Sequence, residues 1–445
     1  MKDGTSRAGV SARGVIRELV VSRKRFLSLV GLSAAGLTVG SCGREVDQRP
    51  SGTTANFLST EAESVEERVS RIIAVYDSQG IHRTGTEGDQ ACARWLAKEV
   101  DGLGIMSSLE GLPFRKIEVI ECSVDIAGHR IEGVPLFNAP PTTRDGISGQ
   151  LSTSADGTSK LGFMPVSPMG GAALGRYRSS TSQAGVIAVT GGEQFGLPPG
   201  LALINAPGYD TPSGPSTIHV GSESLPALQE AAASGTEVRL INYFVKRETE
   251  VYNTTATVDG SNPSLPPLII MTPRSGWWNC ASERGGGIAV WLELMRGLKL
   301  VQPARSVHFV ASTGHELGHY GLDAYLETRH ALIREAVAWI HLGANFGAAV
   351  GGSARFQSSD EEYRQLGRTA MARYDQQPDR EVLPGDRPGG EARSIFDGGG
   401  RYLSLLGGNG LFHHPNDRWP DAVNVVAVAA FARAFTDIAV ELSAA

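Results

Sequence analysis

Three short segments of the chain carry residue types that can bind a metal ion or move a proton. They are 283–287 (Glu-Arg-Gly-Gly-Gly), 315–319 (His-Glu-Leu-Gly-His) and 412–417 (Phe-His-His-Pro-Asn-Asp). Imidazole and carboxylate groups are preferred zinc ligands, and a catalytic zinc ion needs about three of them plus an open position for water. His341, after the apolar run 336–340, is a further candidate ligand. These residue types predict metal-assisted hydrolysis.

The segment 315–319 matches a pattern in which two histidines one helical turn apart bind zinc and the glutamate activates water. Its setting is unfavourable for that class, because it directly follows an expected strand and contains Gly318. The extended pattern is absent, since Leu322 and Tyr325 stand at its Gly and His positions. His315 is therefore either a metal ligand or a general base, a role that suits an imidazole titrating near neutrality.

Two arginines lie close to these segments in the sequence. Arg274 follows the apolar run 268–271, and Arg284 follows Glu283. Either guanidinium group could bind a substrate carboxylate. The alternative is an ion pair with Glu283 or Glu391.

The loop between the two arginines contains Trp277, Trp278 and Cys280. Paired tryptophans at the edge of a site indicate an apolar or aromatic substrate subsite, although packing against the rest of the protein would explain them equally well. Cys280 is either a soft metal ligand or a small packed residue.

The elements that must position these residues can be read from hydrophobic spacing. Helical spacing is expected at 65–76, 91–100 and 288–295, and strands at 252–258, 268–271, 306–311 and 336–340. This order predicts an α/β fold with a mixed, mainly parallel sheet covered by helices. Loops at the carboxyl ends of such strands are where an open α/β sheet places its site.

The middle of the chain differs in composition. Short β-like runs are expected at 185–189, 201–204, 217–220 and 238–241, with one helix at 224–233. Gly, Pro and Ser separate these runs, which predicts an inserted β-rich domain.

The first residues are typical of export. A basic stretch precedes an apolar run that ends at Val39-Gly40-Ser41-Cys42, and the run is too short to span a bilayer. The pattern resembles a twin-arginine signal with Lys24 in the second arginine place, followed by a lipobox whose Cys42 is acylated. An ordinary signal peptide cut near Ser41 is the alternative. Residues 1–42 are thus expected to be a signal peptide and 43–60 a tether, with export to the periplasm or exterior and membrane attachment only through Cys42.

Charge and cysteine content argue against nucleic-acid binding and against cysteine-based structural sites. The formal net charge of the 445 residues is −6, which disfavours nucleic-acid binding through charge. Besides Cys42 the cysteines are Cys92, Cys122 and Cys280. Their odd number and spacing predict neither a disulfide framework nor a Cys-x-x-Cys zinc site.

Beyond the individual motifs, residues 61–445 resemble the zinc aminopeptidase family, whose relatives include glutamate carboxypeptidase-like enzymes, glutaminyl cyclases, nicastrin and the transferrin receptor. The resemblance is carried, in family order, by 83–86 (Arg-Thr-Gly-Thr), 287–293 (Gly-Ile-Ala-Val-Trp-Leu-Glu), 309–311 (Phe-Val-Ala) and 412–417. It implies a catalytic domain formed by 61–117 and 246–445 and a protease-associated insert at 118–245.

The resemblance also implies roles for single residues. Glu283 stands where the family has its metal-bridging aspartate, Glu316 where a glutamate binds metal, and His413 where a late histidine binds metal. His315 occupies the place of the general-base glutamate. Asp417 and His414 would orient the ligands of this region without binding the metal themselves.

Two departures from the family pattern concern the same metal ion. Thr272 and Arg274 stand in place of a His-x-Asp motif, and Gly343 or Ala344 stands where a later acidic ligand would lie. Glu283, Glu316 and His413 would then hold a single zinc ion, as in glutaminyl cyclases. Two zinc ions remain an alternative if His319 and His341 rebuild the second position; otherwise these are structural histidines.

The sequence therefore predicts an exported zinc-dependent hydrolase of the aminopeptidase type, acting on a peptide or small amide substrate. The alternative is a metal-free protein in which the fold serves as a binding or scaffold module. Loss of the His-x-Asp motif favours the alternative, whereas the many histidines and glutamates at strand ends favour the enzyme.

Overall fold

The computed structural model describes residues 63–155 and 157–444. The chain divides into two units, 1–60 and 61–445, and the fold described below is that of the second unit. The predicted signal peptide, Cys42 and the tether lie outside the described residues. Within the described ranges, no helix combines the length and the apolar character needed to cross a membrane.

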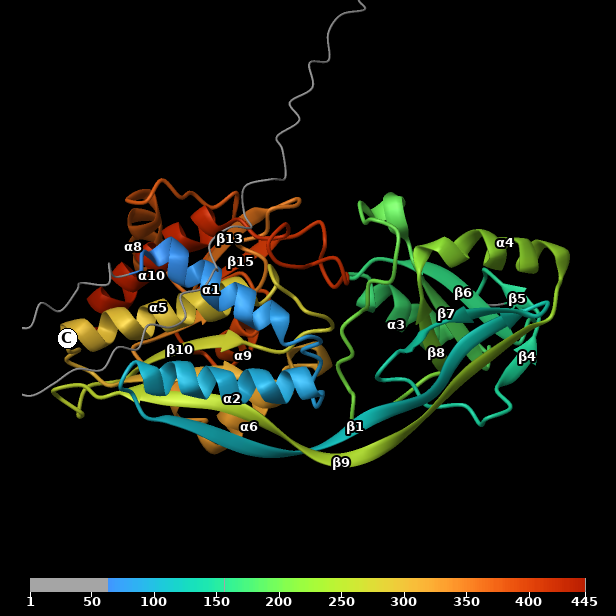
Figure 1. The fold of residues 1–445 in the computed structure, drawn as a ribbon, viewed down its shortest axis with the longest axis horizontal. Coiled ribbons are helices and arrows are strands. Elements are labelled where there is room, and N and C mark those ends of the chain that lie inside the picture. Colours follow the sequence, from blue (N-terminus) through green and yellow to red (C-terminus); the bar gives the residue numbers. More distant parts are fainter. Residues whose placement is uncertain (1–62, 156, 445) are drawn as a thin grey trace, which may run out of the picture. The chain divides into compact units, whose positions relative to one another are not determined.

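The helices and strands alternate along much of the chain (Figure 1). The helices are α1 (Val65–Ser78), α2 (Glu87–Gly102), α3 (Gly171–Ser180), α4 (Leu225–Ser234), α5 (Gly285–Val301), α6 (Tyr320–Thr328), α7 (Leu332–Glu335), α8 (Glu361–Ala372), α9 (Ala392–Asp397) and α10 (Val425–Ala444), with short 3₁₀ turns η1 (Gly192–Phe195), η2 (Ser222–Ser224) and η3 (His315–Leu317). The strands are β1 (Ser107–Ile126), β2 (His129–Glu132), β3 (Val134–Pro135), β4 (Ile147–Gly149), β5 (Leu151–Ser152), β6 (Leu161–Val166), β7 (Gly185–Thr190), β8 (Ser216–Val220), β9 (Val238–Val258), β10 (Leu268–Pro273), β11 (Val307–Ser312), β12 (Ala338–Leu342), β13 (Ser353–Ser358), β14 (Arg380–Val382) and β15 (Tyr402–Gly408).

The larger sheet has the order β14-β13-β15-β12-β10-β11-β9-β1-β2. Its centre is parallel, because β10 pairs in parallel with both β11 and β12, and β12 pairs in parallel with β15. Every residue of β10 is buried, as expected for a strand covered on both faces. One core cluster includes α1, α5 and α10, and another includes α6 and α9, so helices cover both faces. The predicted mixed, mainly parallel α/β fold is confirmed.

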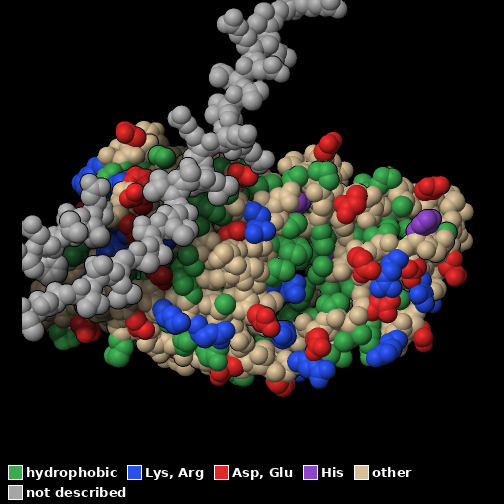
Figure 2. All heavy atoms as spheres, in the orientation of Figure 1, with side chains coloured by type: hydrophobic (Ala, Val, Ile, Leu, Met, Phe, Trp, Pro, Cys, Tyr) green, Lys and Arg blue, Asp and Glu red, His purple; other side chains and the backbone are tan. Residues whose placement is uncertain are grey.

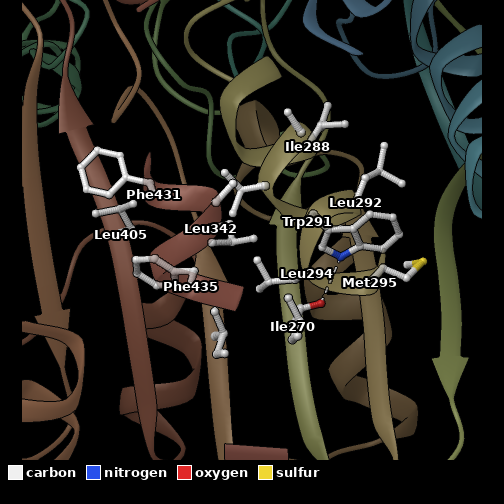
Figure 3. Packing of buried hydrophobic residues seen from close by; sticks show 14 of the residues in the cluster. Ile270, Ile288, Trp291, Leu292, Leu294, Met295, Leu342, Leu405, Phe431 and Phe435 are labelled. Carbon is white, nitrogen blue, oxygen red and sulfur yellow. Dashed lines mark hydrogen bonds between the residues drawn. The ribbon is translucent and has the colours of Figure 1, made fainter. Parts of the chain in front are cut away.

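Helix α5 packs directly on the strands that lead to the candidate site (Figure 3). Its Trp291 side chain donates from Nε1 to the carbonyl oxygen of Ile270 in β10, at 3.2 Å. Close packing depends on glycine at the helix start, since a Cβ on Gly287 would lie 2.7 Å from Thr272 Oγ1 and 2.9 Å from the Leu342 oxygen. The sequence Gly-Gly-Gly thus brings Glu283 and Arg284 up to the strand ends.

A second sheet has the order β3-β8-β7-β6-β5 and its own buried cluster. The long strands β1 and β9 pair antiparallel over nearly their whole length and extend from the larger sheet towards the smaller one (Figure 1). The runs expected as separate strands at 238–241 and 252–258 are therefore one strand. The strand expected at 201–204 is not formed. Although Leu203 is buried there, its backbone N–H donates to the His413 oxygen at 3.4 Å instead of joining a sheet.

Candidate functional site

The candidate residues converge at the carboxyl ends of β10, β11 and β12, together with the loop 411–417. Strand β10 leads to Ser275, and β11 leads through Gly314, at φ 75°, into the 3₁₀ turn η3. Helix α5 starts just after Glu283. The topology of a parallel sheet accounts for this convergence, because the carboxyl ends of its strands share one edge.

Glu283, Arg284 and His413 form the centre of the site. Glu283 Oε1 lies 2.8 Å from Arg284 Nη2 and 3.5 Å from His413 Nε2, and all three side chains are buried. Burial raises the pKa of the Glu283 carboxyl, but Arg284 and His413 outweigh burial and lower this pKa to about 2. Glu283 is therefore ionised at neutral pH.

The orientation of His413 leaves one ring nitrogen free. Its Nδ1 lies 2.8 Å from the Leu203 carbonyl oxygen and donates to it. The Nε2 atom faces Glu283 Oε1 at 3.5 Å. Neither Nε2 nor the two Glu283 oxygens has a hydrogen-bond partner among the described residues, although Arg284 Nη2 lies 2.8 Å from Glu283 Oε1. A buried carboxylate and an imidazole nitrogen that face each other are satisfied by a proton on the nitrogen or by a cation between them.

Glu316 is held differently. Its Oε1 accepts from the Thr84 backbone N–H and from Thr84 Oγ1, both at 2.7 Å, and its Oε2 accepts from Ser275 Oγ at 2.7 Å. An ionised carboxylate offers about four acceptor positions, so these bonds leave one position free on Oε2. No pattern in the sequence indicated that Thr84 and Ser275 would hydrogen-bond to Glu316, because both lie far from it along the chain.

The donor set fits a zinc ion in its chemistry but is only partly assembled. Glu283 and His413 face each other, with Arg284 also beside Glu283, whereas Thr84 and Ser275 use three of the roughly four acceptor positions of Glu316. Within the described residues, no three His, Cys, Asp or Glu side chains gather closely enough to hold a metal ion. The three-ligand zinc site thus stays a prediction, and it requires Glu316 to shift towards the other two residues.

Arg284 is buried beside Glu283 and Ser275. Its Nε donates to the Ser275 oxygen at 2.8 Å, and its two Nη atoms have no hydrogen-bond partner in the described part of the chain. Thr272, at the position of the family's histidine ligand, instead donates from Oγ1 to the Leu342 oxygen at 2.8 Å. Arg284 forms the ion pair with Glu283 that the sequence offered as an alternative, and its binding of a substrate carboxylate stays a prediction.

His315 and His319 face a cavity, but not as a helical zinc motif. Residues 315–317 form a 3₁₀ turn, Gly318 has φ 96° and His319 has φ 70°, so the two histidines do not lie on one α-helical turn. Their ring centroids are 4.9 Å apart. His315 Nδ1 lies 3.1 Å from Glu391 Oε1, and burial together with Arg284 lowers the pKa of His315 well below its usual value. His315 is therefore a neutral imidazole with a buried carboxylate to orient it.

Asp417 supports Glu283 through the backbone. Its two carboxylate oxygens accept from the N–H groups of Ser282 at 2.8 Å and Glu283 at 3.0 Å. This contact places the loop 280–284 against the loop that carries His413.

The other two predicted histidines have hydrogen-bond partners outside this centre. His341 Nδ1 is 2.8 Å from Ser404 Oγ, which agrees with the structural alternative considered from the sequence. His414 Nε2 is 3.2 Å from the Pro199 oxygen, so it contacts the segment that precedes 201–204.

Much of the loop 274–280 is buried, whereas a substrate-binding loop would expose its side chains to the cavity. Arg274 is enclosed and forms a 2.7 Å ion pair with Asp89, so it cannot contact a ligand in the cavity. Trp277 Nε1 donates to Asn205 at 3.1 Å, and Trp278 Nε1 donates to the His413 oxygen at 2.8 Å. These contacts correct the substrate-binding predictions for Arg274 and Trp277, because buried side chains with internal partners are not presented to substrate. Cys280 is a buried free thiol.

A cavity of about 720 Å³ opens beside His315 and His319. Its volume is within the range of small-molecule sites. Its lining includes polar and cationic residues (Ser167, Asn205, His315, His319, Asn345, Arg355, Arg393, Asn409) and apolar ones (Pro168, Met169, Phe195, Leu197, Pro207, Ala344, Leu406, Phe412). A hollow of about 810 Å³ near Glu110, His308 and Arg329 lies away from these candidate residues.

Residues 271–388 match the model of Peptidase family M28. No curated protein sequence matches the chain. The fold is similar to that of a Peptidase M28 precursor from Shewanella amazonensis SB2B, with 15% identity, a TM-score of 0.67 and coverage of 86% of this chain and 95% of the other. It is also similar to BSAP, a zinc aminopeptidase from Bacillus subtilis, with 15% identity, a TM-score of 0.66 and coverage of 84% and 93%.

A third structure, the aminopeptidase from Aneurinibacillus sp. strain AM-1, has 16% identity, a TM-score of 0.62 and coverage of 85% and 94%. The family match and the shared fold support a peptidase-type hydrolase. Zinc is the metal named for the B. subtilis enzyme. The chain therefore resembles the zinc aminopeptidases of Peptidase family M28 in fold and, over residues 271–388, in sequence.

Proposed function

We propose that the protein is a zinc-dependent hydrolase of peptide or amide bonds, of the aminopeptidase type, with a single zinc ion per chain. Glu283, His413 and Glu316 would hold the ion. The observation that carries the proposal is the buried pair of Glu283 Oε1 and His413 Nε2, which face each other at 3.5 Å and form no hydrogen bond among the described residues, with Arg284 on the other side of the carboxylate. A cation between them would satisfy both.

The chain's own residues would bind the substrate and move its protons. A bound zinc ion would supply a Lewis acid and an activated water. His315 lines the cavity and is neutral, so its free Nε2 can accept a proton, while Glu391 orients the ring through Nδ1. Arg284 supplies a fixed positive charge beside Glu283, where the family resemblance implies a second metal ion.

A second candidate function is a metal-free binding module. The Arg284–Glu283 ion pair favours it, because the guanidinium group already compensates the buried carboxylate. In that case the cavity would bind a ligand without turnover.

Export as a lipoprotein is also proposed, and it is supported by the sequence of residues 1–42 alone. The full-length protein should partition with membranes, and Cys42→Ala should release it into the soluble exported fraction. Retention of the variant in the membrane fraction would contradict attachment through Cys42.

The experiment that tests the enzyme is a hydrolysis screen of aminoacyl anilides and short peptides with chelator-treated and zinc-loaded protein. We expect hydrolysis after zinc loading, with loss in His413→Ala and retention in His129→Ala, because His129 is exposed and distant in sequence from the site. Cleavage that survives His413→Ala would refute the zinc assignment. Saturable binding of the same compounds, with no hydrolysis by zinc-loaded protein, would favour the second candidate.

A further inference from the structure

The cavity beside His315 has an unusual charge composition for a site expected to receive a peptide amine. Arg355 from β13 and Arg393 from α9 both line it, and none of the lining residues is Asp or Glu. An ammonium group that entered would meet guanidinium and imidazole groups without a carboxylate in the wall. Opposite charge is the arrangement that favours binding, so this lining favours an anionic ligand.

Arg355 is an unpaired cation in a partly desolvated position. None of the ion pairs found among the described residues includes it, and its buried Nε has no hydrogen-bond partner there. The backbone of Gly389 lies so close that a Cβ would be 2.7 Å from Arg355 Nη2, which means that glycine at 389 makes room for the guanidinium group. An arginine held in this way lacks the anion that would normally accompany it.

Arg393 is a second cation of the cavity that has no ion-pair partner in the described part of the chain. The exposed rim of the cavity, formed by Met169 and Phe195, is apolar. The Arg393 side chain is exposed and takes part in no ion pair of the described residues. Met169 and Phe195 are large apolar side chains with 79% and 47% exposure, and both line the cavity. A ligand that filled the cavity would thus present negative charge to the arginines and apolar atoms to the rim.

We propose that this cavity selects carboxylate-bearing ligands with an apolar side chain, such as N-blocked amino acids or peptides with a free carboxylate, and that Arg355 and Arg393 determine this preference. The choice of carboxylate rests on the proposed function, since peptide cleavage involves such groups. The charge preference itself rests on the cavity lining and is independent of zinc.

The test is calorimetric binding of three probes to chelator-treated protein: N-acetyl-L-leucine, its amide N-acetyl-L-leucinamide, and L-leucinamide, which carries a free amine. The acid should bind about tenfold or more tightly than either other probe, because charge-assisted hydrogen bonds from arginine contribute that much. Arg355→Gln and Arg393→Gln should each weaken acid binding, with the larger loss at Arg355. Arg94→Gln, at an exposed arginine of α2, is the matched control and should leave the affinity unchanged.

The outcomes separate this inference from the proposed enzyme. Acid-selective binding lost in Arg355→Gln supports the inference even if the protein hydrolyses nothing. Tighter binding of L-leucinamide, equal binding of acid and amide, absence of acid binding, or full affinity in both arginine variants would each overturn it. None of these results would alter the zinc-dependent hydrolysis experiment.

Discussion

Glu283 and Arg284 are neighbours in the sequence, and their side chains form a buried ion pair. The sequence identified both residues, the candidate ligand His413 and the alternative of this ion pair. It could not show that Thr84 and Ser275 hold Glu316, because hydrogen bonds between segments far apart in the chain leave no periodic signal. Glu391, which orients His315, lies in a Gly- and Pro-rich stretch that likewise carries no pattern.

Replacing Arg284 tests whether its charge stands in for a metal ion. Arg284→Met should lower the free energy of unfolding of chelator-treated protein by about 3–5 kcal/mol, because it leaves a buried carboxylate uncompensated. Added zinc should restore more stability to the variant than to the wild type, as measured by urea denaturation.

The matched control is Arg387→Met, which breaks the exposed pair with Asp397 and should cost at most about 1 kcal/mol. Suppose that chelator-treated Arg284→Met and chelator-treated Arg387→Met had the same free energy of unfolding. The ion pair would then have no role in compensating the charge of Glu283.

At the level of elements, helices and strands with regular hydrophobic spacing were predictable. The irregular run 201–204 and the long strand β1 were not. The helix expected at 65–76 is α1, and the run 268–271 lies in β10. The run 201–204 failed as a strand because its backbone pairs with no strand: the Leu203 N–H donates to the His413 oxygen, and the Leu203 side chain packs with Trp277 and Leu317. Strand β1 was missed because its exposed and buried residues do not alternate regularly.

Glycine at the start of α5 should be needed for the approach of this helix to β10. Gly287→Ala should lower the free energy of unfolding by about 1–3 kcal/mol, since the added Cβ would meet Thr272 and Leu342. Gly102→Ala, at an exposed helical glycine with nothing within 4 Å, should instead stabilise by about 0.5–1 kcal/mol. If Gly287→Ala and Gly102→Ala changed the free energy of unfolding by the same amount in thermal or urea unfolding, Gly287 would not be needed for the packing of α5 on β10.

His219 in β8 should make stability depend on pH. Burial, with Arg178 and His413 nearby, lowers its pKa from 6.5 to about 3. The unfolded chain therefore binds a proton that the folded chain does not, and stability falls as pH decreases from 6.5 towards 3. Between pH 7.5 and 5.0 the wild type should lose about 2 kcal/mol more than His219→Leu. Parallel pH profiles in urea denaturation would contradict a neutral buried His219.

Across the whole described domain, the site depends on the irregular segment 201–206, which lies between β7 and β8 of the smaller sheet. The Leu203 oxygen fixes the His413 ring, and the Ala206 N–H donates to the Glu316 oxygen at 2.8 Å. On the face shown in Figure 2, acidic and basic side chains are interspersed, with no large field of one charge among the residues coloured there. The cationic cavity is thus a local feature, and its specificity must come from single residues such as Arg355.

The family resemblance supplied the fold and the candidate ligands, but the state of the site had to come from the three-dimensional arrangement. The sequence showed that Thr272 and Gly343 stand at positions where the family resemblance implies metal ligands. Only the packing around the strand ends shows that Arg284 turns inward to Glu283 while Arg274 pairs with Asp89. The central claim is therefore that one metal position is retained and the other is replaced by a guanidinium group.

Zinc content per chain tests this claim most directly. Wild-type protein should be stripped with chelator, reloaded with zinc, dialysed and measured by elemental analysis beside His413→Ala, Glu316→Ala and the control His129→Ala. The account predicts about one zinc ion per chain in the wild type and the control, and none in the two ligand variants. No zinc in the wild type, two ions per chain, or full zinc content in His413→Ala would contradict it.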